Sequence, residues 1–423
     1  MPPQLEDVAD EENNIWTLKN LPPQPHMREI YWPYAPDVAP FFRDSLVQIV
    51  ARTYYLDRLN SNGTIAQAWT GGGWIAYRSG LFAEMFGVHA ALYTSQPFFA
   101  PGNEGGTLLL TSGQNALNVV GQAYGRAQIL DQEFRGGRML VDTPLINPQD
   151  NRMVPNTFEG IQLVTLPDKE RSYDYSIGFL SEIKQRDLNS FISMSQALVG
   201  SPTPINNGAY YAMVKYRPLP GLSTTFMDYQ VNDFVNTGFA QAEYDFRRPK
   251  DVPNFILGAN IIDQNSNGAD LLTGMPFQTY QASATVQASY VGWTAFAAGS
   301  ATGNQQNMFL PFGTNPAYTN MQQVSFDDAN EKALGASLAY DFGYAFDKYG
   351  LSGLTVGFWD RRPILRPEIE LIAVTQGWNA TNPTTGAPIH NYPQKRPQKR
   401  TSTGAFSSGQ GGKQYGPKSP TTF

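Results

Sequence analysis

The sequence predicts an all-β fold, a transmembrane antiparallel β-barrel, and three observations lead to this prediction. Apolar and polar side chains alternate strictly in segments such as residues 279–290, the pattern of a strand with two unlike faces. That segment is roughly twice as long as an ordinary soluble strand. Only 16% of the 423 residues are charged, against roughly 25% in soluble domains. No apolar run approaches the roughly 18 residues of a membrane helix, whereas a spanning strand needs about 10.

Residues 1–40 are expected to form a polar, proline-rich lead-in to the barrel. Residues 1–14 are acidic and contain no hydrophobic region of a secretory signal. Three interpretations stay open: a cytosolic chain, a leader that has been removed, or a start assigned too far downstream.

The barrel itself is expected over residues 41–374, where about sixteen alternating segments are separated by turns. In residues 172–183 the predicted apolar face includes Ile177 and Ile183, and the polar face includes Glu182. Apolar faces that end in Tyr, Phe or Trp are typical of strands that cross two lipid interfaces. A soluble sandwich also alternates, but these polar faces carry few Lys or Glu residues, which favours the membrane barrel.

Residues 375–423 are expected to be a disordered basic tail. From residue 391 to the end there are six basic residues and no acidic residue. The repeated PQKR followed by Ser, Gly and Thr is typical of disorder, so we expect no nucleic-acid partner.

The residue types exclude several kinds of chemistry. The chain has no cysteine, so disulfides, thiolate catalysis and cysteine metal sites are impossible. His26, His89 and His390 are far apart in the sequence, which argues against a histidine metal site or a catalytic triad. Residues 263–268 resemble half of a calcium loop, but Gly274 stands where a Glu is required. We therefore expect no catalytic residues, no metal and no cofactor.

Two stretches of the chain carry distinctive motifs. Residues 41–58 contain F-x-[DE]-S followed by R-[NT]-YY, and residues 144–160 fit the pattern P-x-[LI]-x(3)-D-x-R-[LM]-x-P-x-TF-x-G. The matching positions are Phe42, Asp44, Ser45, Arg52, Thr53, Tyr54 and Tyr55, then Pro144, Ile146, Asp150, Arg152, Met153, Pro155, Thr157, Phe158 and Gly160. Both motifs resemble those of the OprD family of substrate-specific outer membrane porins, and the resemblance covers roughly residues 41–360.

The resemblance implies an 18-strand barrel in the outer membrane of a Gram-negative bacterium. It also implies passive uptake of small carboxylate-bearing solutes, such as basic amino acids or aromatic acids. The family's third long loop folds into the lumen and narrows it, and we place that loop at about residues 142–158. No convincing strand follows residue 375, so the last two strands are expected to be missing. A lost reading frame is one hypothesis, and closure as an even barrel of about 16 strands is the alternative.

In the family, a ladder of Arg and Lys on the inner wall faces acidic groups across the constriction. Successive guanidinium groups can pass a carboxylate along without binding it tightly at any one site. By alternation, Arg126, Lys215 and Arg217 are expected to point inward. The full set of ladder candidates is Arg52, Arg78, Arg126, Arg135, Arg138, Arg152, Lys215 and Arg217, and the candidate constriction acids are Asp142, Asp150 and Glu159.

The expected partners are small carboxylate solutes, outer membrane lipid and the barrel-assembly machinery, with the chain a monomer or a trimer. Two other classes of function remain open. One is a soluble or surface β-rich binding protein. The other is an enzyme borne on a barrel, which would need a Ser or Asp beside a His.

Overall fold

A computed structural model describes residues 38–60, 63–166, 171–200, 205–248, 252–321 and 325–341, together with the backbone of residues 355–363 and 372–375. The expected lead-in and basic tail lie almost entirely outside these residues. The few residues of them that are described include the start of the short helix α2 (Pro40–Arg43). No helix among the described residues is long and apolar enough to cross a membrane.

The described chain is almost entirely β-structure. Seventeen strands belong to one sheet, and two of them, β8 and β17, span only two and four residues. Besides α2 there are the single-turn η1 (Ser112–Gln114) and the helix α3 (Met194–Val199). The strands are β1 (Leu46–Leu59), β2 (Ile65–Arg78), β3 (Phe86–Phe99), β4 (Leu117–Ile129), β5 (Gln132–Met139), β6 (Thr157–Thr165), β7 (Tyr173–Lys184), β8 (Ile192–Ser193), β9 (Ala209–Leu219), β10 (Leu222–Val231), β11 (Val235–Asp245), β12 (Asn254–Ser266), β13 (Gln278–Tyr290), β14 (Trp293–Thr302), β15 (Lys332–Asp341), β16 (Thr355–Pro363) and β17 (Ile372–Thr375).

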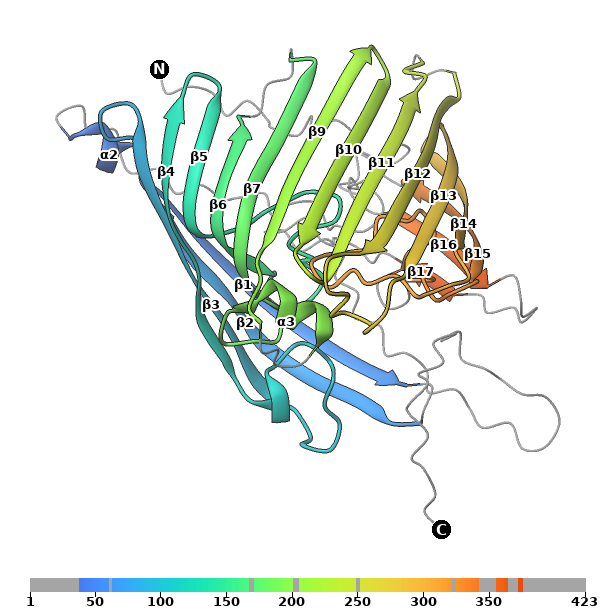
Figure 1. Ribbon diagram of the computed structural model, residues 1–423, viewed down its shortest axis with the longest axis horizontal. Helices are drawn as coiled ribbons and strands as arrows, with labels where there is room; N and C mark the ends of the chain where they lie inside the picture. The colour runs from blue at the N-terminus through green and yellow to red at the C-terminus, as the bar shows by residue number, and fades with distance from the viewer. Residues whose placement is uncertain are drawn as a thin grey trace.

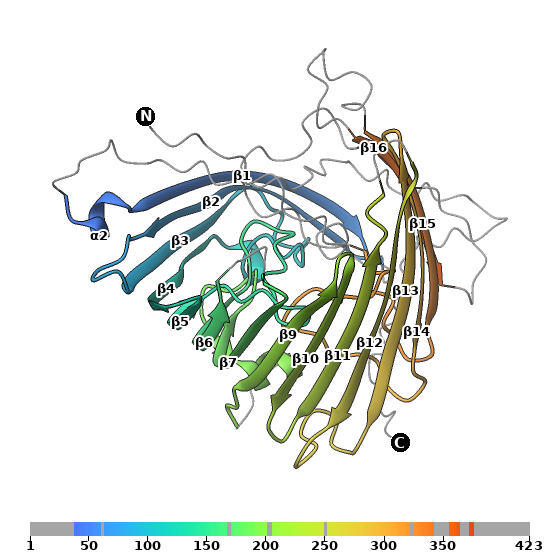
Figure 2. The ribbon, with the colours of Figure 1, turned by 90° about the horizontal axis from the view of Figure 1, so that it is seen from above.

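The strands form a curved wall in which each long strand pairs antiparallel with the next along the chain (Figure 1). The pairing passes from β7 directly to β9 and then continues to β17. Seen from above, the wall curves around an interior that contains loop segments (Figure 2). Such an antiparallel sheet, in which most backbone groups are paired, is the architecture that the sequence predicts.

The wall is polar inside and apolar outside, the reverse of a soluble protein. In β13 the polar side chains of Thr279 and Gln281 are 2% and 1% exposed, whereas Tyr280 and Val286 are 47% and 42% exposed. The same alternation of buried and exposed residues is found in β10, β11 and β12. An apolar outer face suits lipid, so the orientation of these faces agrees with the transmembrane barrel that the sequence predicts.

The two ends of the wall differ in the length of their connections. At the short-turn end, residues 130–131, 220–221 and 291–292 link neighbouring strands. At the long-loop end the connections include residues 100–116, 140–156, 185–208 and 303–331.

One predicted face is wrong in β7. The register with β6 shifts between Glu159 and Gly160, so that Ser181 is the extra residue of a bulge. A bulge reverses the alternation beyond it. Ile183, expected on the apolar outer face, is instead fully buried, as is Leu180 on the other side of the bulge.

Candidate pore constriction

Segment 140–156 leaves β5, runs inside the curve of the wall, and returns to β6 (Figure 2). It carries apolar side chains such as Ile146 and Val154 that are fully buried. The sequence placed this loop at about residues 142–158, but Thr157 and Phe158 already belong to β6. This in-folded segment, residues 140–156, lies where it can narrow the lumen.

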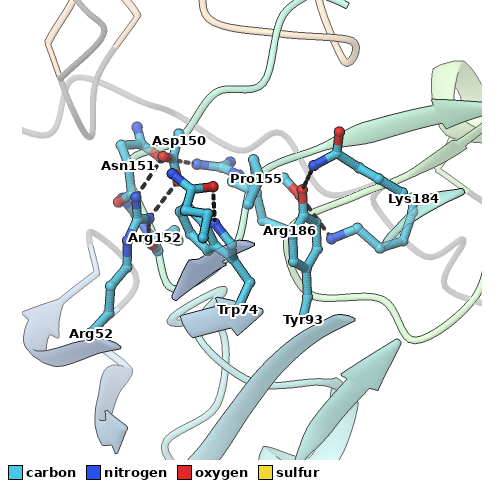
Figure 3. Close-up of polar contacts among 11 residues, drawn as sticks. Arg52, Trp74, Tyr93, Asp150, Asn151, Arg152, Pro155, Lys184 and Arg186 are labelled. Carbon is cyan, nitrogen blue, oxygen red and sulfur yellow. Dashed lines mark hydrogen bonds and ion pairs between the residues drawn. The ribbon is translucent and has the colours of Figure 1, made fainter. Parts of the chain in front are cut away.

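An ion pair fixes the segment to β1. The Arg52 guanidinium donates from Nη1 and Nη2 to the two carboxylate oxygens of Asp150, at 2.6 and 2.7 Å, and both side chains are about nine-tenths buried. Arg52 also donates to the Arg152 carbonyl oxygen and lies 4.3 Å from the centre of the Trp74 ring (Figure 3). This bidentate geometry is the strong form of a charge-assisted hydrogen bond.

Two further basic side chains hold the segment from the side of β7. Lys184, fully buried at the end of β7, donates from Nζ to the Pro155 carbonyl oxygen at 2.8 Å and lies 5.4 Å from the Tyr93 ring centre. Arg186 donates from Nη1 to Oδ1 of Asn151 (Figure 3). The second half of the segment is therefore held at three residues: Asp150 from β1, Pro155 from the end of β7, and Asn151 from the connection that follows β7.

Positive charge is concentrated in this region. Burial, together with the nearby positive charge of Arg152, lowers the pKa of Arg186 to about 9. Burial likewise lowers the pKa of Arg152, whose Nε donates to the Thr107 carbonyl oxygen of segment 100–116. A buried cation with few anionic neighbours is stabilised by any anion that reaches it, because burial deprives it of water.

A second in-folded segment, residues 303–331, also lies inside the wall wherever the structure describes it, over residues 303–321 and 325–331. Thr319 and Tyr318 are fully buried, and the Tyr318 hydroxyl donates to Oε1 of Glu243 on β11 at 2.8 Å. Near its end, burial raises the pKa of Asp327 to about 6, although an Asn315 amide donates to its carboxylate. Burial raises the pKa of Glu331 to about 7.

Toward the short-turn end, a buried acid lies among the predicted basic residues. Glu133 accepts from Arg126 at 3.2 Å, from Arg135 at 2.5 Å and from Gln128 at 2.7 Å. Alternation places these side chains on the inner face of β4 and β5, as the sequence predicts for Arg126. Arg78 lies on the inner face of β2, directly opposite His89 in the register.

A last group of charges lies at the short-turn end of β7 and β9. Arg217 pairs with the Asp174 carboxylate at 2.7 Å, and Lys215 is directly opposite Asp174 in the register. Val214 and Tyr216, which flank Lys215, are exposed on the outer face. The alternation predicted for Lys215 and Arg217 therefore agrees with the structure.

Two predicted lumen residues lie elsewhere. Arg138 donates from Nε to Glu159 at 2.8 Å, and these side chains are 41% and 38% exposed. In the register they share the face of the exposed Ile161, opposite to the buried Met139. The sequence could not fix this register, and neither Arg138 nor Glu159 belongs to the lumenal set. Asp142 is on the in-folded segment and is exposed.

Four charged residues of these clusters were not singled out from the sequence: Glu133, Asp174, Lys184 and Arg186. Alternation alone could have found Glu133 and Asp174, because they share a face with Arg135 and Ser176. Lys184 and Arg186 follow the bulge in β7, where alternation fails. No cluster of three or more His, Asp or Glu side chains in the described part of the chain could hold a metal ion.

Comparison with known proteins identifies a family and a fold. The family model described as outer membrane porin, OprD family, matches residues 39–362. Among solved structures, the chain resembles Pseudomonas aeruginosa OpdK with vanillate (18% identity, 76% of this chain and 83% of that chain, TM-score 0.66). It also resembles P. aeruginosa OccK8 (OprE) (21% identity, 77% of this chain and 85% of that chain, TM-score 0.65). A third similar structure is Acinetobacter baumannii OccAB2 (20% identity, 77% of this chain and 82% of that chain, TM-score 0.66). No curated protein matches.

Proposed function

This chain belongs to the OprD family of outer membrane porins, and from this premise we propose that it lets small carboxylate-bearing solutes diffuse passively through its lumen. The observation that carries the proposal is the run of basic side chains along the inner side of the wall. It begins with Arg52 and Arg152 at the in-folded segment and continues through Arg126 and Arg135 to Arg217 near the short-turn end.

The proposed route follows from this distribution of charge. In membrane barrels of this kind the long loops face the outside and the short turns face the periplasm. A solute carboxylate would therefore meet the constriction bases Arg52 and Arg152 first, then Arg126 and Arg135, and finally Lys215 and Arg217. Each guanidinium offers paired donors that match a carboxylate. Because the acids Asp150, Glu133 and Asp174 already occupy donors at each step, a passing anion is held weakly and released.

A structural relative supports the choice of solute class. The OpdK structure is named as a complex with vanillate, an aromatic carboxylate. We propose the same chemical class for this chain, with aromatic acids and basic amino acids as the first candidates. The basic ladder is then Arg52, Arg78, Arg126, Arg135, Arg152, Lys215 and Arg217, and the acids of the constriction are Asp142 and Asp150.

We also propose how the remaining parts of the chain relate to the channel. Residues 41–374 would form the membrane domain, with residues 1–40 and 375–423 outside it. Its partners would be outer membrane lipid and the barrel-assembly machinery. A channel of this type needs no catalytic residue.

The test uses the refolded protein in a planar lipid bilayer. We expect benzoate to reduce the single-channel KCl current in a concentration-dependent manner, and benzyl alcohol, which has the same ring without the charge, to have little effect. Arg135→Gln should weaken the benzoate effect. Lys332→Gln removes the same charge from an exposed position on β15 and should leave it unchanged. Equal effects of benzoate and benzyl alcohol would overturn the proposed solute class.

A further inference from the structure

Asn147 lies where the two in-folded segments, residues 140–156 and 303–331, meet. It belongs to segment 140–156, is fully buried, and makes three hydrogen bonds to residues 312–314 of the other segment. Its backbone N–H donates to the Phe312 carbonyl oxygen at 3.1 Å. Its side-chain oxygen accepts from the Thr314 N–H at 2.9 Å, and its Nδ2 donates to the Thr314 carbonyl oxygen at 3.5 Å.

The same side chain also organises its own segment. Its Oδ1 accepts from the Gln149 N–H at 3.1 Å, and its Nδ2 donates to the Pro144 carbonyl oxygen at 3.3 Å. The amide thus uses both its donor and its acceptor on each side of the junction. Asn and Gln carry both functions on one planar amide, and Gln is one methylene longer.

The opposite side of the junction is shaped to receive this side chain. A Cβ atom at Gly313 would lie 2.6 Å from Asn147 Cγ, closer than real contacts allow. Gly313 therefore leaves the space that the Asn147 amide fills. The adjacent Phe312 ring is buried and packs edge-on against Tyr229 of β10, which holds this part of the second segment in place.

The two segments are fixed to different parts of the wall. Segment 140–156 is held from β1 and the end of β7 through Asp150 and Pro155. Segment 303–331 is held from β11 and β12, where Tyr318 donates to Glu243 and Asn260 donates to the Pro316 carbonyl oxygen. Through Asn147, the contacts thus connect β1 and β7 with β11 and β12. These two groups of strands occupy different parts of the curved wall (Figure 2).

We propose that Asn147 is a positioning residue that couples the two in-folded segments into a single partition, so that they block or clear the lumen together. This inference rests on the proposed function, because it describes how the same passage is regulated. Its physical basis is cooperative: with Asn147 in place, neither segment can move away without breaking the hydrogen bonds to the other. Without it, each segment is held by its own wall contacts alone.

The first experiment uses the absence of cysteine from the chain. In the double variant Asn147→Cys with Gly313→Cys, the sulfur introduced at position 147 would lie near the present Asn147 Cγ, 2.6 Å from Cβ of residue 313. That proximity is within reach of a disulfide, whose S–S bond is about 2.05 Å. We expect a steady, low KCl current from the oxidised protein. Reduction by dithiothreitol in the same bilayer should produce frequent transitions to a higher-conductance state.

Oxidised and reduced states belong to the same folded molecule, so a failure to fold cannot imitate the result. Identical current amplitudes and noise before and after reduction, with the disulfide confirmed by mass spectrometry, would overturn the coupling.

Single substitutions provide the second experiment. Asn147→Ala removes the side-chain hydrogen bonds and should raise the population of the higher-conductance state roughly tenfold or more. Asn147→Asp keeps the acceptor and loses the donor, so we expect an intermediate effect. The matched control is Asn320→Ala, since Asn320 is also buried and donates to the Asn315 carbonyl oxygen within its own segment. An equal increase in Asn320→Ala would mean general loosening and would sink the proposal.

These measurements use KCl alone, so they are independent of the solute. If benzoate fails to block but reduction still releases the gate, the coupling stands and the carboxylate proposal falls. If benzoate blocks selectively and reduction changes nothing, the carboxylate proposal stands and the coupling falls.

Discussion

The Arg52–Asp150 pair should set the charge preference of the channel, and the two single neutral substitutions should shift it in opposite directions. Asp150→Asn removes a negative charge from the constriction and leaves the Arg52 guanidinium available to solute. Arg52→Gln removes the positive charge and leaves the carboxylate. The double variant restores neutrality with two amides.

The magnitude follows from the geometry. A solute carboxylate on Arg52 must lie close to Asp150, whose oxygens are 2.6 and 2.7 Å from the guanidinium nitrogens. At about 6 Å, repulsion between two anions is about 0.7 kcal/mol in water and about 3 kcal/mol at an effective dielectric constant of about 20. Since about 1.4 kcal/mol is a factor of ten, Asp150→Asn should raise the preference for anions over cations at least about threefold.

The assay is the reversal potential of single channels in a KCl gradient, with benzoate block as a second readout. Asp150→Asn should move the potential toward chloride and strengthen the block, whereas Arg52→Gln should do the reverse. The double variant should lie near the parent, because interacting residues are compared reliably only through such a cycle. Shifts of the two single variants in the same direction would refute the reasoning and would indicate that both act by releasing segment 140–156.

Three further outcomes are expected. Lys184→Met removes a charged hydrogen bond to Pro155, of a kind that contributes about 1.5–3 kcal/mol, so single-channel records should show more frequent large openings; an unchanged record would exclude this anchor. The raised pKa of Asp327, about 6, means that its contribution to the stability of segment 303–331 is complete below its ordinary pKa near 4 and is lost as pH rises through 6. Current should therefore be lower and quieter at pH 4 than at pH 7, and Asp327→Asn should flatten that difference. Gly73→Ala places a Cβ atom 1.9 Å from a backbone oxygen at φ +126°, in a sparsely populated backbone region that costs an L-residue about 1–3 kcal/mol. It should reduce the heat-modifiable folded fraction on gels, while Gly125→Ala, with open space around it, should not.

The sequence predicted the wall well because strand alternation is a local property. In residues 279–290 each side chain could be assigned to a face from its parity, and the buried Gln281 and exposed Tyr280 confirm the assignment. The same reasoning placed Arg126 on the inner face. Lipid outside and polar lumen inside reinforce this pattern, so each strand carries it independently of its neighbours.

Alternation failed where the register slips. The extra residue at Ser181 reverses the faces beyond it, and nothing in the residues around it marks a bulge. Arg138 was uncertain for a related reason: its face depends on the start of the adjacent in-folded segment, which parity does not give. The family pattern indicated that the third loop enters the lumen, but its main partners are distant in sequence. Asn147 and Thr314 are 167 residues apart, and no local pattern connects them.

The acids beside the bases have a physical consequence for transport. A lone buried guanidinium would bind a carboxylate strongly, since little water competes for it, and a tightly bound solute would block the passage. The protein instead supplies its own carboxylates, from Asp150, Glu133 and Asp174. An incoming anion exchanges one charge-assisted contact for another of similar strength, so neither entry nor release is costly. On this reasoning, removing an internal acid should strengthen solute binding and slow its release, and the same change should lower flux at saturating solute even as affinity rises.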